Sequence, residues 1–164
     1  MNERPVIIGF DGTPPAERAI HEAATVLAPR NAYIVVVWEA GRAFDLVDIP
    51  TKSLGMPSAA LEIRTAAELD KAAAESARRL AERGAALATD AGLRAKGIAV
   101  ADDITVADTL TRLAREFDAS VIVVGSHGHR GITELLVGST TRDVLRHAPC
   151  PVLVARVDTR VKHH

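Results

Sequence analysis

The sequence VIVVGSHGHRGITELLVGSTTRDVLRHAPCPVLV, residues 121–154, decides the fold class of this chain. It contains an apolar run, a glycine-rich loop, a segment with helical spacing and a second apolar run. Glycines let a backbone turn and approach a ligand closely, and hydroxyl side chains at a helix start favour an anion. The stretch therefore predicts a strand, loop, helix and strand in which Ser139, Thr140 and Thr141 are candidates for anion binding.

The rest of the chain continues the same alternation. Apolar runs predict strands at residues 5–10, 32–38, 95–100, 121–124 and 151–155. Helical spacing predicts helices over 14–28, 59–91, 106–117 and 139–147. This order requires a parallel sheet covered by helices on both faces, with right-handed crossovers. Pro149 and Pro151, which flank Cys150 at the start of the last apolar run, indicate that this strand lies at an edge of the sheet.

Local signals support the helix starts and leave one long loop. Thr13 before two prolines is typical of a helix N-terminus, and Thr105 with Asp108 resembles a capping box. The segment 39–58 shows no periodic pattern, and because loops of this length are usually functional, we expect a lid there. The charged residues of the helix over 59–91 are expected to form its solvated face.

The composition describes one globular domain. The 164 residues are 48% hydrophobic and only 3% aromatic, so one core can be buried and its side chains must be mainly aliphatic. We expect this domain to span residues 1–158, with a tail over 159–164. The net charge of −1 provides no field that would attract nucleic acid or a membrane surface.

Three absences in the sequence favour a cytoplasmic location. The single cysteine excludes an intrachain disulfide framework, and the first residues contain no apolar signal region. No apolar run approaches the roughly 20 residues that a membrane-spanning helix needs. Cys150, between two prolines, is interpreted as a small buried residue rather than a redox thiol.

Ligands of open parallel sheets bind outside the carboxyl ends of the strands, where the strand order reverses. The loops to inspect are therefore residues 11–13, the segment after Trp38, residues 101–103 and residues 125–131. The glycines alone leave two readings open, a phosphate cradle or a simple turn followed by a helix cap. Asp11 likewise has two readings, a ligand contact or a turn residue at the start of a helix.

Two common nucleotide signatures are missing. There is no G-x-x-x-x-G-K-[S/T] motif, no G-x-G-x-x-G follows a strand, and no lysine lies between Gly125 and Asp143. Phosphate charge would have to be met by amides, hydroxyls, His127, His129 or Arg130. A phosphate site without lysine suits nucleotide binding better than fast hydrolysis. His127 and His129 on a glycine-rich loop are only a weak signature of a metal site.

The spacing Gly125-x2-Gly128-x9-Gly138-Ser139 matches the G-x2-G-x9-G-[S/T] signature of the ATP-binding branch of the universal stress protein family. The sequence VIIGFDGTPPAERAI (6–20) also resembles the family's first strand, acidic loop and helix. The sequence HAPCPVLVAR (147–156) resembles its closing segment. The chain is thus similar to this family over nearly its whole length.

The resemblance implies a three-layer α/β sandwich with a five-stranded parallel sheet in the order 3-2-1-4-5, a Rossmann-like fold of the adenine nucleotide alpha hydrolase-like type. It implies binding of ATP, ADP or AMP together with Mg²⁺, which Asp11 could help to hold. In the nucleotide site that it implies, Val37 or Trp38 lies beside adenine, and Gly138, Ser139 and Thr140 bind the phosphate chain. The other residues of the implied site are Asp11, Gly12, Thr13, Gly125, Ser126, Gly128, His129 and Arg130.

The resemblance further implies a homodimer through the strand at 151–155 and a role in the stress response with a protein partner yet to be identified. No constellation of a catalytic base with transition-state charge stabilisation is visible, so we expect ATP to act as a switch, with at most slow hydrolysis. Two alternatives stay open: a scaffold that binds no nucleotide, and an adenylate-transfer enzyme, for which no signature is found.

Two residues depart from the family pattern. His129 stands where members often carry Lys or Arg, and Trp38 stands where a smaller aliphatic residue is usual. Trp38 could stack on adenine or narrow its pocket.

ATP binding is predicted to weaken as the pH rises from about 6 to 8, because His129 loses its positive charge over this range. Titration calorimetry with ATP at several pH values measures this change. An affinity that stays flat across the range would contradict a phosphate contact by His129.

Overall fold

The computed structural model describes residues 3–41, 59–102, 104–126 and 137–156. The elements are β1 (Val6–Gly9), α1 (Pro14–Leu27), β2 (Asn31–Trp38), α3 (Ala59–Asp90), β3 (Arg94–Ala101), α4 (Val106–Glu116), β4 (Val121–Gly125), α5 (Ser139–His147) and β5 (Val152–Ala155). The predicted alternation of strands and helices is confirmed, and each boundary differs from the predicted one by at most one residue.

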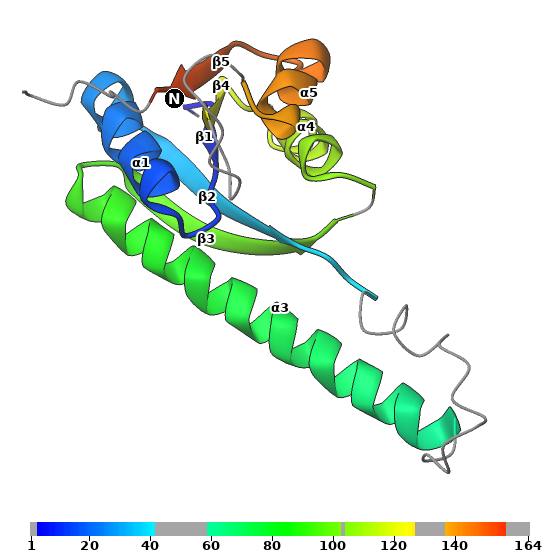
Figure 1. Ribbon diagram of the computed structural model, residues 1–164. Helices are drawn as coiled ribbons and strands as arrows, with labels where there is room; N and C mark the ends of the chain where they lie inside the picture. Colours follow the sequence, from blue (N-terminus) through cyan, green and yellow to red (C-terminus); the bar gives the residue numbers. More distant parts are fainter. Residues whose placement is uncertain (1–2, 42–58, 103, 127–136, 157–164) are drawn as a thin grey trace, which may run out of the picture.

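The strands form one parallel sheet in the order β3-β2-β1-β4-β5 (Figure 1). In the centre of the sheet Val6 of β1 lies between Ala32 of β2 and Val121 of β4. The order implied by the family resemblance is therefore confirmed, and so is the edge position of β5. The strand order reverses between β1 and β4.

Helices cover both faces of the sheet, as the continuous apolar runs require (Figure 1). Val6 and Ile8 point into the core beneath α1 and α3, and Ile7 points into the core beneath α4 and α5. All three of these side chains are fully buried. Strand β1 thus has no solvent face, which explains why its sequence shows no polar alternation.

The predicted helix starts are confirmed by their caps. Thr13 Oγ1 accepts a hydrogen bond from the Ala16 amide at 3.4 Å, and two prolines occupy the first turn of α1. Thr105 Oγ1 accepts from the Asp108 amide at 3.1 Å and donates to its carboxylate at 2.7 Å. Each cap satisfies an amide that the helix itself cannot pair.

Helix α3 packs on β2 and β3 and extends beyond the sheet (Figure 1). A Cβ atom at Gly97 of β3 would lie 2.5 Å from the carbonyl carbon of Ala81 in α3. A Cβ atom at Gly84 of α3 would lie 2.7 Å from the Phe10 ring. Glycine at these two contacts therefore permits a closer approach of helix and sheet than any other residue would.

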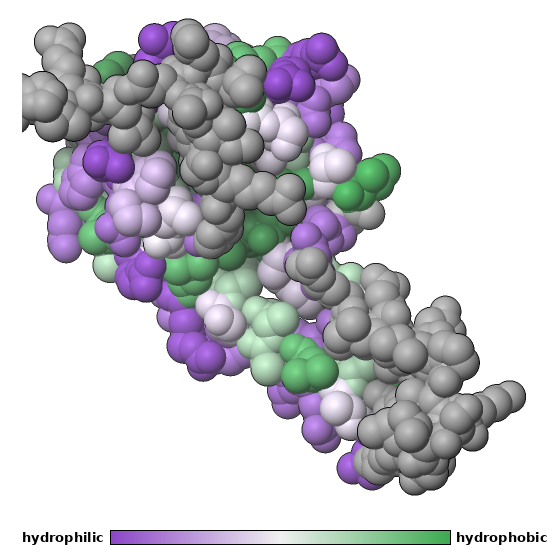
Figure 2. Space-filling view, in the orientation of Figure 1, coloured by the Kyte–Doolittle hydropathy of each residue, from purple (hydrophilic) through white to green (hydrophobic). Residues whose placement is uncertain are grey.

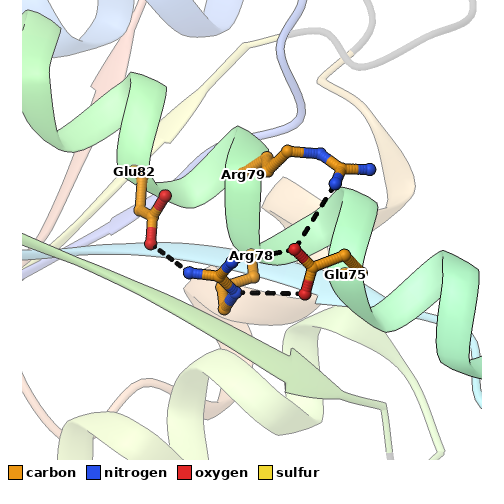
Figure 3. A network of polar contacts seen from close by, with 4 residues as sticks. All are labelled: Glu75, Arg78, Arg79 and Glu82. Carbon is orange, nitrogen blue, oxygen red and sulfur yellow. Dashed lines mark hydrogen bonds and ion pairs between the residues drawn. The ribbon is translucent and has the colours of Figure 1, made fainter.

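The outer side of α3 is charged, as its sequence predicts, and Figure 2 shows hydrophilic residues along its outer border. Arg78 bridges Glu75 at 2.8 Å and Glu82 at 2.6 Å, and Arg79 lies 3.4 Å from Glu75 (Figure 3). The hydrogen bond and the charge of Arg78 lower the pKa of Glu75. Within the described part of the chain, none of the helices combines the length and apolarity that crossing a bilayer requires.

Replacing Gly97 with alanine is expected to lower the free energy of unfolding by about 1–3 kcal/mol, because the added methyl group forces α3 away from β3. Urea denaturation measures this loss. Gly138→Ala is the matched control: the nearest atom to its added Cβ is 3.7 Å away, so a loss below about 1 kcal/mol is expected. Equal stability of Gly97→Ala and the unsubstituted protein would contradict the close packing.

Candidate functional site

The parallel pairing of β1 with β4 brings two of the predicted loops to one edge of the sheet. Ile8 pairs with Val123, so both strands end at the same level. The loop 11–13 follows β1, and Gly125 and Ser126 end β4 and begin the next loop. This edge, at the reversal of strand order, is where doubly wound sheets bind ligands.

The loop 11–13 is a tight turn held by its acidic residue. Asp11 Oδ1 accepts hydrogen bonds from the Thr13 amide at 3.0 Å and from the Thr13 hydroxyl at 2.6 Å. Gly12 has a φ of +78°, which favours glycine. Asp11 is therefore a turn residue, as one of its two readings predicted. Its second oxygen, Oδ2, accepts no hydrogen bond from the residues the structure describes, and it is the oxygen left for a ligand hydroxyl or a cation.

Helix α3 braces this turn through contacts that the sequence did not reveal. The Arg83 guanidinium lies 3.5 Å from the Gly12 carbonyl oxygen and 3.8 Å from a Glu17 carboxylate oxygen. A Cβ atom at Gly12 would lie 2.9 Å from Leu80. Only the charge of Arg83 was visible in the sequence, and 71 residues separate it from the turn, so no local signal could reveal the contact.

The start of α5 lies directly beside the end of β4. The Gly138 amide donates to the Ser126 carbonyl at 3.1 Å, and the Ser126 amide donates to the Ala155 carbonyl at 2.9 Å. Gly138 caps α5 without any side-chain hydrogen bond, and the first turn carries no acidic residue. The first amides of the helix, with the exposed Ser139 and the half-buried Thr140, are therefore suited to an anion.

The Thr141 hydroxyl has a structural role that differs from the one proposed for Ser139 and Thr140. Its side chain is 4% exposed, and its Oγ1 donates to the Gly125 carbonyl at 2.8 Å. The hydroxyl hydrogen is thereby committed to joining β4 to α5. The prediction that groups Thr141 with Ser139 and Thr140 as an anion ligand is therefore wrong for this residue, because its hydroxyl faces the sheet.

Val37 and Trp38 end β2 on opposite faces of the sheet, as successive residues of a strand must. Val37 packs on the cluster beneath α4 and α5, which contains Val124 and Val144. Trp38 packs on the cluster beneath α1 and α3. Of the two residues named for the adenine position, Val37 thus lies on the side of α5.

The remaining predicted contacts, Gly128, His129 and Arg130, lie outside the described residues, as do His127 and the segment 42–58. Their roles stay predictions. In the parts of the chain that are described, no group of three His, Cys, Asp or Glu side chains is arranged to hold a metal. Burial raises the pKa of the half-buried Cys150 thiol, which fits its interpretation as a packing residue.

The sheet is doubly wound, and an acidic turn and a helix N-terminus without a side-chain cap lie where its strand order reverses. These features define a class of α/β domains that is suited to small phosphorylated ligands. The particular family follows from comparison. The chain belongs to the universal stress protein family, whose model matches residues 3–156.

The chain is similar to known members of this family over most of its length. A universal stress protein of Mycobacterium tuberculosis is 32% identical over 93% of this chain, which spans 45% of that protein's length. The universal stress protein from Archaeoglobus fulgidus, solved in complex with dAMP, is 20% identical with a TM-score of 0.62 over 94% of this chain and 98% of that chain. A family member from Arabidopsis thaliana, solved with AMP bound, is 12% identical with a TM-score of 0.58 over 94% and 92%.

Thr141→Val is expected to lower the free energy of unfolding by about 1–3 kcal/mol, because the partly buried Gly125 carbonyl loses its donor while the side-chain volume is kept. Thr141→Ser, which retains the hydroxyl, is the matched control and should lose less. Urea denaturation of both variants measures the difference. If valine is tolerated better than serine, the hydrogen bond does not hold β4 to α5.

Proposed function

We propose that this protein binds an adenine nucleotide at the reversal between β1 and β4, with the phosphates at the start of α5. The observation that carries the proposal is the first turn of α5, which has no side-chain cap and lies beside the end of β4. This turn offers its amides and the hydroxyls of Ser139 and Thr140 to an anion. The dAMP and AMP complexes of two family members support adenine as the base.

The proposed placement of the nucleotide follows from the faces of the sheet. Adenine lies against Val37, because Val37 and α5 are on the same face and Trp38 is on the other. Asp11 Oδ2 receives the ribose or the Mg²⁺ that accompanies the phosphates. Gly128, His129 and Arg130 complete the phosphate cradle through the matched ATP-binding motif. ATP is the proposed ligand, with ADP and AMP as related ones.

We infer that the bound nucleotide acts as a switch on a cytoplasmic stress-response regulator and that hydrolysis is incidental. Asp11 Oδ1 is already engaged by Thr13, which suits a positioning role better than that of a catalytic base. The edge strand β5, whose Val152, Leu153 and Val154 are only partly buried, is the proposed interface of a homodimer.

Ser139→Ala and Thr140→Ala are each expected to weaken AMP and ATP binding by about 3- to 10-fold, because each removes one hydroxyl donor to a phosphate. Thr25→Ala, which removes a hydroxyl that donates to the His21 carbonyl within α1, is the matched control and should leave binding unchanged. Titration calorimetry measures all three variants.

Two outcomes would replace this proposal with one of its alternatives. Protein that carries no nucleotide on purification and gains no thermal stability from millimolar ATP would be an interaction scaffold. Sustained ATP turnover of about 1 s⁻¹ or faster, lost in Gly138→Ala, would make the protein an ATPase, because typical enzymes turn over at about 10 s⁻¹.

A further inference from the structure

A pocket lies at the amino ends of β1, β2 and β3, at the opposite edge of the sheet from the loop 11–13 and the start of α5. Its volume is 450 Å³, within the range of about 300–1,000 Å³ that is typical of small-molecule sites. The walls come from residues 3–5, the first residues of β2 and β3, and the end of α4. The candidate nucleotide site uses none of these residues.

Ion pairs fix the walls of this amino-edge pocket. Glu3 pairs with Arg94 at 2.7 Å, and Arg94 Nε donates to Asn31 Oδ1 at 3.1 Å. Arg4 pairs with the Asp118 carboxylate at 2.8 Å and donates from Nε to the Asp118 carbonyl at 3.0 Å. Each exposed pair contributes little alone, but together they hold residues 3–5 against both β3 and α4. The pocket is therefore formed without a ligand.

One wall of the pocket is aromatic. Tyr33 of β2 and Phe117 at the end of α4 stack with ring centroids 4.7 Å apart and an interplanar angle of 23°. Phe117 remains 37% exposed although it is apolar. The chain has five aromatic residues in all, so two of them stacked at one pocket form an uncommon surface in this protein. Such a surface favours a planar ring, which packs on it in an offset or edge-to-face geometry.

The side chains that line the pocket carry a net positive charge, which favours an anionic ligand. Lys96 of β3 is paired in register with Tyr33, so its side chain lies on the same face of the sheet. Within the described part of the chain, Lys96 has no ion pair or hydrogen bond. The other two cations of the lining, Arg4 and Arg94, are paired with carboxylates. Three basic and two acidic side chains line the pocket, which leaves one positive charge to be matched.

We propose that the amino-edge pocket binds a small aromatic monocarboxylate. The ring of the ligand packs against Phe117 and Tyr33, and its carboxylate lies beside Lys96. A neutral ring would gain no ion pair with the exposed Lys96, and an aliphatic acid would make no contact with the aromatic rings. Because the pocket and the nucleotide site lie at opposite edges of the sheet, the two ligands contact different residues and do not compete.

Fluorine NMR of 4-fluorobenzoate tests this proposal on the full chain. The expected result is saturable binding in the millimolar range, with much weaker binding of 4-fluorobenzyl alcohol, which lacks the charge. Lys96→Gln should weaken binding by about three- to fivefold, the effect of one exposed ion pair. Lys71→Gln, at an exposed lysine of α3, is the matched control and should bind as the unsubstituted protein does.

A second variant separates the ring contact from folding. Phe117→Leu keeps an apolar side chain and should lose affinity while its melting temperature shows that the fold persists. Three results would overturn the proposal: binding that does not saturate, equal loss in the Lys96 and Lys71 variants, or displacement of 4-fluorobenzoate by AMP. Displacement by AMP would mean that the two ligands compete for one site.

Discussion

The parallel pairing of β1 with β4 is the constraint on which the rest of the structure depends. Each strand is buried on both faces, so its register cannot slip without exposing apolar side chains to water. That register places the turn 11–13 and the end of β4 at the same edge. The hydrogen bond from Thr141 to Gly125 then fixes the start of α5 beside them. The candidate site is thus a consequence of core packing.

Periodicity and turn residues were sufficient to predict the elements of this fold. Each predicted strand and helix is present. Apolar runs without polar alternation are typical of strands in a sheet that is covered on both faces. The ends were less predictable. Strand β3 reaches from Arg94 to Ala101 because β2 pairs with it throughout, and pairing between distant segments leaves no local signal. The strand order came from the family resemblance.

The candidate site was predictable only where its chemistry is local. Gly138 and Ser139 could be placed at a helix start, and Asp11 in a turn, because each depends on its immediate neighbours. The brace from Arg83 depends on a contact across the fold, and so does the inward hydroxyl of Thr141. The alternation of side chains along a strand already separates Val37 from Trp38, although only the packed helices show which face carries α5.

Hydrogen exchange followed by mass spectrometry, with and without saturating ATP, tests the central claim most directly. The account predicts slower exchange in two separate segments, the turn 11–13 and the first turn of α5 at 138–141, with no change at the amino ends of β2 and β3. Protection confined to the amino edge, or no protection at either segment, would contradict a nucleotide site between β1 and β4.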